Sequence, residues 1–311
     1  STLDNAFRYL LAPGQGKGTW EIGPEAPLAL GEVAGGAING VLYFVGEGSH
    51  ETIAYDIQSN TWTSGLADRP NAGDHHGAEV IGDKLYIVGG IDHDDHNHDS
   101  AGKVQIYTPA TNSWTLGTSI PFATGSASTA VINGKIYVAG GIVAHATVAS
   151  AAVYDPSGNS WLSIADMPAG RNHAASASDG QKFYIFGGRG FGSGDDNVVA
   201  EGFADVQIYD PATNTWKVSC DPSLPPPYPE CDYTIPFLPQ KRGGMGKAVF
   251  FDGEFYVFGG ETTLPSSPGQ VAGNVYNRVD VYNPVTKTWR EEATLPTARH
   301  GIFPILHDGR I

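Results

Sequence analysis

The chain has 311 residues, and its 41 glycines make up about 13 % of them, where ~7 % is usual. Only 16 % of the residues are charged, and 33 acidic against 18 basic residues give a formal net charge of −15. A surface this acidic repels a phosphate backbone, which argues against a nucleic-acid partner. No apolar run reaches the ~18 residues of a membrane-spanning helix, which argues against membrane insertion.

A repeat runs along the whole chain. Each of the six tryptophans follows a Ser or Thr, and five of them lie seven residues after a tyrosine. The tryptophans are Trp20, Trp62, Trp114, Trp161, Trp216 and Trp289, and the tyrosines are Tyr55, Tyr107, Tyr154, Tyr209 and Tyr282. Turn formers such as Asp155-Pro156 stand between them, so each stretch from Tyr to Trp predicts a β-hairpin. The tryptophans, one in each unit, are interpreted as packing residues between units.

A second hairpin precedes each of these five. A strand of small residues leads into a tight turn, and an aromatic and β-branched strand follows. The turns are Asn39-Gly40, Gly82-Asp83, Asn133-Gly134, Asp179-Gly180 and Asp252-Gly253. The strands after them are expected at residues 42–45, 85–88, 136–139, 183–186 and 255–258. Four short strands per unit predict an all-β fold, a six-bladed β-propeller of four-stranded antiparallel blades.

The order of these features resembles the kelch repeat: strand, turn, Tyr-x-x-Gly-Gly, loop, Tyr-Asp-Pro and Trp. The glycine pairs are Gly89-Gly90, Gly140-Gly141, Gly187-Gly188 and Gly259-Gly260, and the first unit departs from the pattern with Gly46-Glu47-Gly48. The resemblance implies one kelch propeller domain over residues 1–311. Its units lie at approximately 28–65, 70–117, 122–164, 169–219, 241–292 and 297–311 plus 5–22, with a proline-rich insertion at 217–241.

The sixth unit is split between the two ends of the sequence. Residues 299–306, with the turn Asp308-Gly309, resemble the start of a unit, and residues 7–11 and 18–22 resemble its end. We expect the N-terminal strands to join the C-terminal blade and close the ring. The pattern asks for one more strand after the turn. It is expected either from a continuation of the natural protein by roughly a dozen residues or from a neighbouring chain.

Strand direction alternates within a blade, so the long loops should share one face and the tight turns the other. The long segments are residues 91–103, 189–203, 217–241 and 261–279. Nine of the ten histidines are expected on this long-loop face, with several arginines near the central funnel. We predict a ligand site there that suits carboxylates or polar sugars. Its residues are Arg69, His75, His76, Arg171, His173, Arg242, Arg299 and His300. The alternative is that these side chains only bridge blades through backbone carbonyls.

The segment from Asp92 to Asp99 is the densest group of potential metal ligands. Its imidazoles would suit Zn²⁺, and its alternating oxygens would suit Ca²⁺. The candidate ligands are His93, Asp94, Asp95, His96, His98 and Asp99. The calcium-loop pattern is incomplete, because Ser100 stands where a glycine is needed. A solvated loop is the alternative.

Cys220 and Cys231 are the only cysteines, and they bracket the proline-rich insertion. Two cysteines around an otherwise irregular loop predict a disulfide, which points to an oxidising compartment. The alternative is a pair of reduced thiols in a cytosolic protein.

Three classes of function remain open. The preferred one is an extracytoplasmic module (secreted, periplasmic or on the cell surface) that binds or adheres to a protein or glycan ligand on the long-loop face, as intracellular kelch adaptors bind protein substrates. A sialic acid mutarotase, a six-bladed kelch enzyme, provides the enzymatic alternative, in which Glu32, Arg171, His173, Arg242 and Arg299 would line the funnel; no motif identifies a catalytic residue. The third is a self-assembling surface subunit completed by a neighbour's strand. Further domains of a longer chain are also expected partners.

Overall fold

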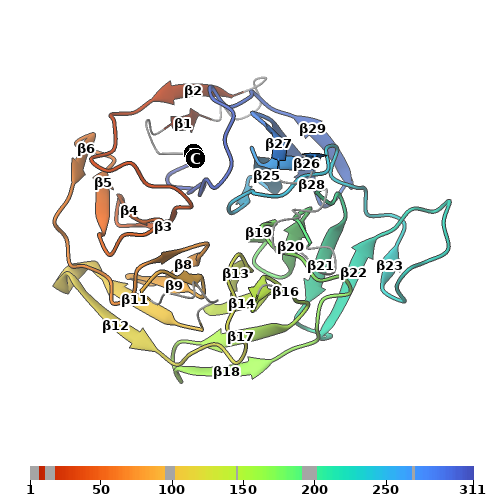
Figure 1. The fold of residues 1–311 in the computed structure, drawn as a ribbon, viewed down its shortest axis with the longest axis horizontal. Helices are drawn as coiled ribbons and strands as arrows, with labels where there is room; N and C mark the ends of the chain where they lie inside the picture. The colour runs from red at the N-terminus through yellow and green to blue at the C-terminus, as the bar shows by residue number, and fades with distance from the viewer. Residues whose placement is uncertain (1–6, 11–17, 95–101, 145, 191–201, 268–269) are drawn as a thin grey trace.

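A computed structural model describes residues 7–10, 18–94, 102–144, 146–190, 202–267 and 270–311. Five sheets, each with four antiparallel strands and one of them with an added fifth strand, stand around a central axis like the blades of a propeller (Figure 1). The all-β propeller fold expected from the sequence is therefore present. In the described part of the chain, no helix has the length and apolar character needed to cross a membrane.

The blades follow one another along the chain, and each is built from the inside of the ring outwards. Blade 1 comprises β3 (Ala34–Ile38), β4 (Val41–Val45), β5 (Ile53–Asp56) and β6 (Thr61–Thr63). Blade 2 comprises β8 (Gly77–Ile81), β9 (Lys84–Val88), β11 (Val104–Thr108) and β12 (Ser113–Gly117), with a 3₁₀ turn at Pro109–Thr111. Blade 3 comprises β13 (Ser128–Ile132), β14 (Lys135–Ala139), β17 (Ala151–Asp155) and β18 (Ser160–Ser163). Blade 4 comprises β19 (Ala175–Ser178), β20 (Phe183–Phe186), β21 (Val206–Asp210) and β22 (Thr215–Ser219). Blade 5 comprises β24 (Val249–Phe251), β25 (Glu254–Phe258), β28 (Val279–Asn283) and β29 (Thr288–Glu291).

The expected sixth blade is not a four-stranded sheet among the described residues. β1 (Phe7–Leu10) and β2 (Thr19–Ile22) form a separate two-stranded sheet, and the segment 297–311 has only the bridge between His307 and Arg310. The expectation of six complete blades is therefore corrected to five. The reason is that, among the residues described, β1 and β2 pair only with each other and no strand joins them to the segment 297–311.

The apolar core lies between the blades. The outer strand of each unit carries a tryptophan that contacts the segment connecting the preceding unit to its own. Each indole Nε1 donates a hydrogen bond to a backbone carbonyl of that connecting segment. The pairs are Trp20 with Ala293, Trp62 with Pro24, Trp114 with Ala67, Trp161 with Thr118, Trp216 with Ala165 and Trp289 with Pro236. The tryptophans therefore link neighbouring units.

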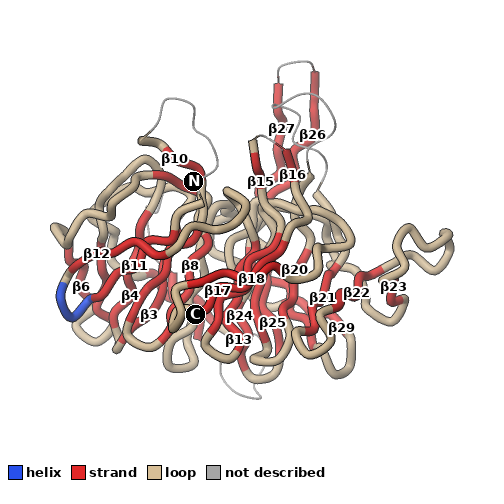
Figure 2. Tube along the Cα trace, turned by 90° about the horizontal axis from the view of Figure 1, so that it is seen from below, coloured by secondary structure: helices blue, strands red, loops and turns tan. Residues whose placement is uncertain are grey.

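Figure 2 shows the two faces of the ring. Three two-stranded sheets stand on one of them, which we call the loop face. Two are hairpins, β15 (Ile142–Val143) with β16 (Ala146–Thr147) and β26 (Glu261–Ser267) with β27 (Gln270–Val275), and the third pairs β7 (Gly73–Asp74) with β10 (Ile91–Asp92), which flank β8 and β9 in the chain. The tight turns lie on the other, the turn face. The insertion at 217–241 instead extends sideways from the rim (Figure 1), because it follows the outermost strand of blade 4.

Cys220 and Cys231 form the expected disulfide, with their Cα atoms 5.5 Å apart. The bridge folds the insertion back so that β23 (Cys231–Asp232) pairs in parallel with β22 and becomes a fifth strand of blade 4. The insertion is thus attached to the blade at both of its ends.

Candidate functional site

One backbone position is repeated around the mouth of the central funnel. It lies just before each inner strand, and its φ angle is in the left-handed region. The residues are Glu32 (+40°), His75 (+53°), Ser126 (+54°), His173 (+53°), Gly244 (+62°) and Gly301 (+61°). Residues other than glycine rarely adopt this backbone conformation, and such strain concentrates at functional sites. Four of the six positions with this strained backbone are occupied by residues with polar side chains.

Hydrogen bonds connect these positions from unit to unit. The amide of Ser126 donates to the carbonyl of His75 (2.8 Å), and the amide of His173 donates to that of Ser126 (3.1 Å). On the opposite side the amide of Gly301 donates to the carbonyl of Gly244 (2.9 Å). The backbone therefore holds the side chains in a defined ring.

The two glycines make room for carboxylates. A Cβ atom on Gly301 would lie 2.5 Å from Oε1 of Glu32, and one on Gly244 would lie 2.8 Å from Cγ of Glu261. Both carboxylates therefore enter the ring where a larger residue would exclude them. We call the group Glu32, His75, Ser126, His173, Glu261 and His300 the polar ring.

Within the polar ring, Oγ of Ser126 and Nε2 of His173 are hydrogen-bonded at 3.3 Å, whereas the carboxylates stand farther from the imidazoles. Oε2 of Glu32 lies 3.8 Å from Nε2 of His75, and its Oε1 lies 4.0 Å from Nε2 of His300. His300 in turn points Nδ1 at Oε2 of Glu261, 3.7 Å away. These separations exceed a hydrogen bond. Oε1 of Glu261 is paired with Nη1 of Arg189 at 2.7 Å.

The imidazoles of the ring differ in their protonation. Burial opposes the charged form of His75, but its hydrogen bond to Asp74 (2.6 Å) and the nearby Glu32 carboxylate outweigh burial and raise its pKa. His173 lies edge-on to His75, with ring centroids 4.8 Å apart. Burial, and after it the charges of Arg189 and the other histidines, hold the pKa of His173 well below its usual value. Of the two imidazoles, His75 therefore takes up a proton more readily, and His173 stays neutral.

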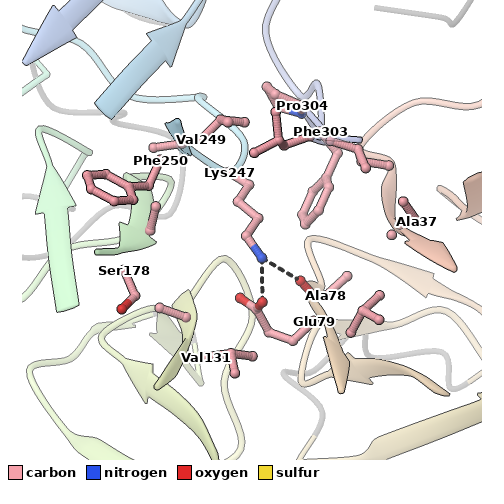
Figure 3. A pocket seen from close by; sticks show the side chains of 18 residues that line it. Ala37, Ala78, Glu79, Val131, Ser178, Lys247, Val249, Phe250, Phe303 and Pro304 are labelled. Carbon is pink, nitrogen blue, oxygen red and sulfur yellow. Dashed lines mark hydrogen bonds and ion pairs between the residues drawn. The ribbon is translucent and has the colours of Figure 1, made fainter. Parts of the chain in front are cut away.

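A small cavity of ≈ 60 Å³ lies at the polar ring and reaches Lys247. There the Lys247 ammonium is paired with the Glu79 carboxylate and donates to the carbonyl of Ala78, 3.3 Å away. Thr129 donates its hydroxyl to the same carboxylate (2.9 Å). Figure 3 shows this ion pair among the side chains that line a second cavity of ≈ 290 Å³, together with Phe250 and Phe303. Lys247 lines both cavities.

The predicted arginines lie within the blade interfaces. Arg69 is 1 % exposed and its Nη2 donates to the carbonyls of Gly46 and Gly73. Arg242 is fully buried and paired with Asp280 at 2.9 Å. Arg171 is paired with Asp205 at 2.6 Å, and Arg299 is also buried. Ligand binding by these four stays a prediction, while their burial favours the alternative that they bridge blades.

His76 is buried as well. Its Nδ1 donates to the carbonyl of Gly89 (2.7 Å) and its Nε2 accepts from Nη1 of Arg69 (2.6 Å). Burial and the Arg69 charge lower the pKa of His76 to about 3. Of the predicted site, His75, His173 and His300 are therefore the residues that the fold brings together at the funnel.

Only two of the predicted metal ligands are described. Nε2 of His93 lies 3.0 Å from Oδ2 of Asp74, and Asp94 lies 2.9 Å from Nε2 of His50. Asp95, His96, His98 and Asp99 lie outside the described residues. Within the described ranges, no three His, Cys, Asp or Glu side chains gather as a metal site. Metal binding by the 92–99 loop therefore remains a prediction.

The site also contains residues outside the predicted set, namely Glu261, Arg189 and Ser126, together with Glu32, which appeared only in the enzymatic alternative. A signal for two of them is present in the sequence. The residue after each glycine pair is Ile91, Ile142, Arg189 or Glu261, so only the last two units place a charge there. These two charges form the ion pair beside the ring.

Known proteins resemble the chain in sequence and fold. A profile described as the KLHDC2/KLHL20/DRC7 Kelch-repeats domain matches residues 38–238, and one described as the Kelch motif matches 243–296. "Kelch-like protein terF" of Aspergillus terreus is 28 % identical over 268 residues, which cover 83 % of this chain and 52 % of that protein. "Beta-scruin" of Limulus polyphemus is 33 % identical over 91 residues, 29 % of this chain and 10 % of that protein. The chain thus spans about half the length of the first relative and less of the second.

A solved structure titled "Structure of YjhT" superposes with a TM-score of 0.73 and 19 % sequence identity. The match covers 92 % of this chain and 90 % of that chain. At this identity the likeness concerns the fold.

Proposed function

Because the chain belongs to the kelch-repeat family, we propose that it is a protein-binding module whose loop face takes a basic side chain of its partner into the polar ring. The observation that carries the proposal is the pair of carboxylates, Glu32 and Glu261, set into the mouth of the funnel. The formal net charge of −15 favours association with a basic surface.

The geometry supports a cationic group more than an anionic one. Glu32 is 22 % exposed, and the imidazoles nearest to it stand 3.8 and 4.0 Å away, beyond hydrogen-bond distance. A lysine ammonium or an arginine guanidinium would donate to such acceptors. Arg189 is paired directly with Glu261, from a buried position beside the ring, and its charge acts on Glu32 only from a greater distance.

The test is titration with short peptides that contain Arg or Lys, followed by calorimetry, with the peptide Gly-Arg-Gly as the first probe. Glu32→Gln is expected to weaken binding about tenfold by removing a charged acceptor. Glu25→Gln removes the same charge from an exposed position and should leave affinity unchanged. Equal weakening by both variants would show a general charge effect and contradict the proposal.

Acidification provides a second test of the same site. As pH falls, His75, whose pKa is raised, becomes positive beside Glu32 and competes with a cationic ligand. Affinity for the peptide should therefore fall with pH, whereas a carboxylate-bearing ligand would gain affinity. The opposite trend would favour the anionic ligands predicted from the sequence.

A glycan remains the second candidate ligand, because acceptors and donors alternate around the ring in the way that sugar hydroxyls require. A glycan array with and without EDTA tests glycan binding and the metal role of residues 92–99 together.

Assays of sialic acid anomers test the enzymatic alternative. An extracytoplasmic location is also proposed, supported by the disulfide, and thiol labelling of the protein from its native source tests it.

A further inference from the structure

The proline-rich insertion after blade 4 has a fixed base. The disulfide between Cys220 and Cys231 and the pairing of β23 with β22 hold it against blade 4. Beyond the disulfide, Ile235 and Leu238 are 4 % and 2 % exposed and pack in the apolar core between blades 4 and 5. The amide of Leu238 also donates to the carbonyl of Ala204 (2.7 Å). Both ends of the insertion are therefore fixed to the ring.

Between these ends, residues 222–229 project from the rim (Figure 1), and we call this segment the proline tip. Its sequence is Pro-Ser-Leu-Pro-Pro-Pro-Tyr-Pro, and all of its residues are exposed except Tyr228, which is half-buried. The side chain of Leu224 is 60 % exposed, and no residue of the tip belongs to the buried core. The tip thus presents to solvent an apolar surface that does not stabilise the ring by packing.

The backbone of the tip is restricted to extended conformations. Proline fixes φ at about −65°, and a residue before a proline is biased towards the polyproline II region. Each of residues 224–226 precedes a proline, as does Tyr228. Turns close both ends: the amide of Leu224 donates to the carbonyl of Asp221 (3.2 Å), and the amide of Cys231 donates to that of Tyr228 (3.3 Å). The tip therefore has little conformational freedom to lose on binding.

The exposure of the tip is a property of blade 4. The tip stands on the outer side of that blade, whereas β1, β2 and the segment 297–311 lie beyond blade 5 (Figure 1). A strand that completed the sixth unit would pair there and would not cover the tip. The tip is thus available to a partner however the sixth unit is completed.

The side chains of the tip define the partner. Consecutive prolines in a polyproline II helix dock into grooves lined by aromatic side chains, as in SH3 and WW domains. No basic residue lies between Asp221 and Cys231, so an acidic groove that pairs with an arginine beside the prolines finds no partner here. The order Pro-Pro-x-Tyr at residues 225–228 instead suits a groove with a second pocket for a tyrosine ring, as in WW domains. Asp221 and Glu230 flank the tip and favour a groove with a basic rim.

We propose that the proline tip is a docking site for a separate protein that carries an aromatic-lined groove of the WW type. Pro225 and Pro226 would enter between the aromatic side chains of that groove, and Tyr228 would fill the adjacent pocket. The inference goes beyond the proposed function, because the tip lies on the rim of blade 4 and not at the polar ring. Either site can fail its test without affecting the other.

The test is calorimetry with a purified WW domain that binds Pro-Pro-x-Tyr peptides, added to the oxidised 311-residue protein. Saturable binding is expected. Tyr228→Ala should weaken it at least ~10-fold. Tyr233→Ala removes another tyrosine of the same insertion, 47 % exposed, and should leave the affinity unchanged. No binding, or equal weakening by the two variants, would overturn the proposal.

A second pair of variants tests the prolines in the same way. Pro226→Ala should weaken binding at least ~10-fold, because it removes a proline ring from the groove. Pro222→Ala changes an exposed proline of the same tip outside residues 225–228 and should bind as wild type does. Equal weakening by both proline variants would mean that binding follows the shape of the loop and would contradict docking of the prolines.

A linear peptide of residues 221–230 keeps the result interpretable if a variant distorts the insertion. It carries the same side chains without the anchored ends, so it should bind the same domain roughly threefold more weakly or less tightly still. Binding of the peptide but not of the protein would mean that the folded insertion conceals the segment. A dimer of the protein that is lost in Tyr228→Ala would mean that a second copy of the chain occupies the tip. Either result contradicts the proposal.

Discussion

At the scale of single residues, two adjacent histidines have pKa values shifted in opposite directions in this fold. His75 and His76 are adjacent, yet burial and the charge of Arg69 keep His76 neutral, whereas Asp74 and Glu32 favour the charged form of His75. The left-handed backbone at His75 turns its side chain into the funnel. His76 instead lies between Arg69 and the carbonyl of Gly89.

Stability should therefore fall on mild acidification. The pKa of His76 is lowered to about 3 and that of His173 is well below normal, so between about pH 6.5 and those values the unfolded chain binds protons that the folded chain does not. From pH 7 to pH 5 this costs roughly 2 kcal/mol of unfolding free energy per histidine. His75 acts in the opposite direction, because its raised pKa adds stability that is complete below its unfolded pKa and lost as pH rises through its folded value.

The measurement is urea denaturation at pH 7 and pH 5 on wild type and His76→Gln. His76→Gln should reduce the loss on acidification by about one histidine's contribution. An identical pH dependence in the two proteins would contradict a buried neutral His76.

At the scale of elements, the outer hairpins are connected to their neighbours by an asparagine with left-handed backbone. In blade 3, Asn159 (φ +45°) accepts hydrogen bonds on Oδ1 from the Tyr154 hydroxyl (2.6 Å) and from the amide of Thr118 (2.7 Å). Asn112 and Asn214 make the same pair of contacts in blades 2 and 4. The residue therefore shapes the turn and joins one blade to the preceding connection.

Asn159→Ala should destabilise the protein by about 2 kcal/mol, because it removes two hydrogen bonds and places a Cβ-bearing residue without a local side-chain partner in the left-handed region. Asn159→Gly removes the same hydrogen bonds but tolerates the backbone, so its loss should be smaller. Thermal unfolding of the two variants separates these contributions. Equal stability of both variants and wild type would show that the contacts contribute nothing.

At the scale of the whole molecule, the ring encloses two neighbouring cavities of different character that share Lys247. One reaches the polar ring, and the other is lined by Phe250, Phe303 and the ion pair of Lys247 with Glu79 (Figure 3). Glu79 is only 4 % exposed, and Thr129 and Lys247 satisfy it from two other blades. The pair thus joins three blades across the axis.

Lys247→Met should cost about 2 kcal/mol, since it leaves a buried carboxylate without its cation. Combining it with Glu79→Gln should recover most of the loss, because the charge is then removed together with its partner. Lys84→Met, at an exposed position, serves as the control. Chemical denaturation of wild type, Lys247→Met, Glu79→Gln and the double variant completes the cycle, and a double variant as unstable as Lys247→Met would contradict this account.

Much of the fold could be predicted from the sequence, but little of the candidate site could. Alternation, turn dipeptides and the Tyr-to-Trp spacing predicted the strands of all five blades correctly, since each pattern acts within one hairpin. Arg69 and Arg242 were predicted at the funnel because they precede inner strands, but position along a strand does not reveal burial. Glu261 was missed as a ligand group because its carboxylate enters the ring only through the space left by Gly244.

By itself, the sequence determined the repeated blade, the kelch family and the disulfide partners, because local hydrogen bonding and side-chain alternation repeat with every unit and one cysteine pair leaves a single connectivity. Only the tertiary structure decided which polar side chains meet. His75, His173 and His300 come from three units that are distant in the chain, and the ring of left-handed residues brings them together with Glu32 and Glu261. Only it reduced the expected six blades to five among the described residues, because strand pairing between distant segments follows from the closed ring and not from any one repeat.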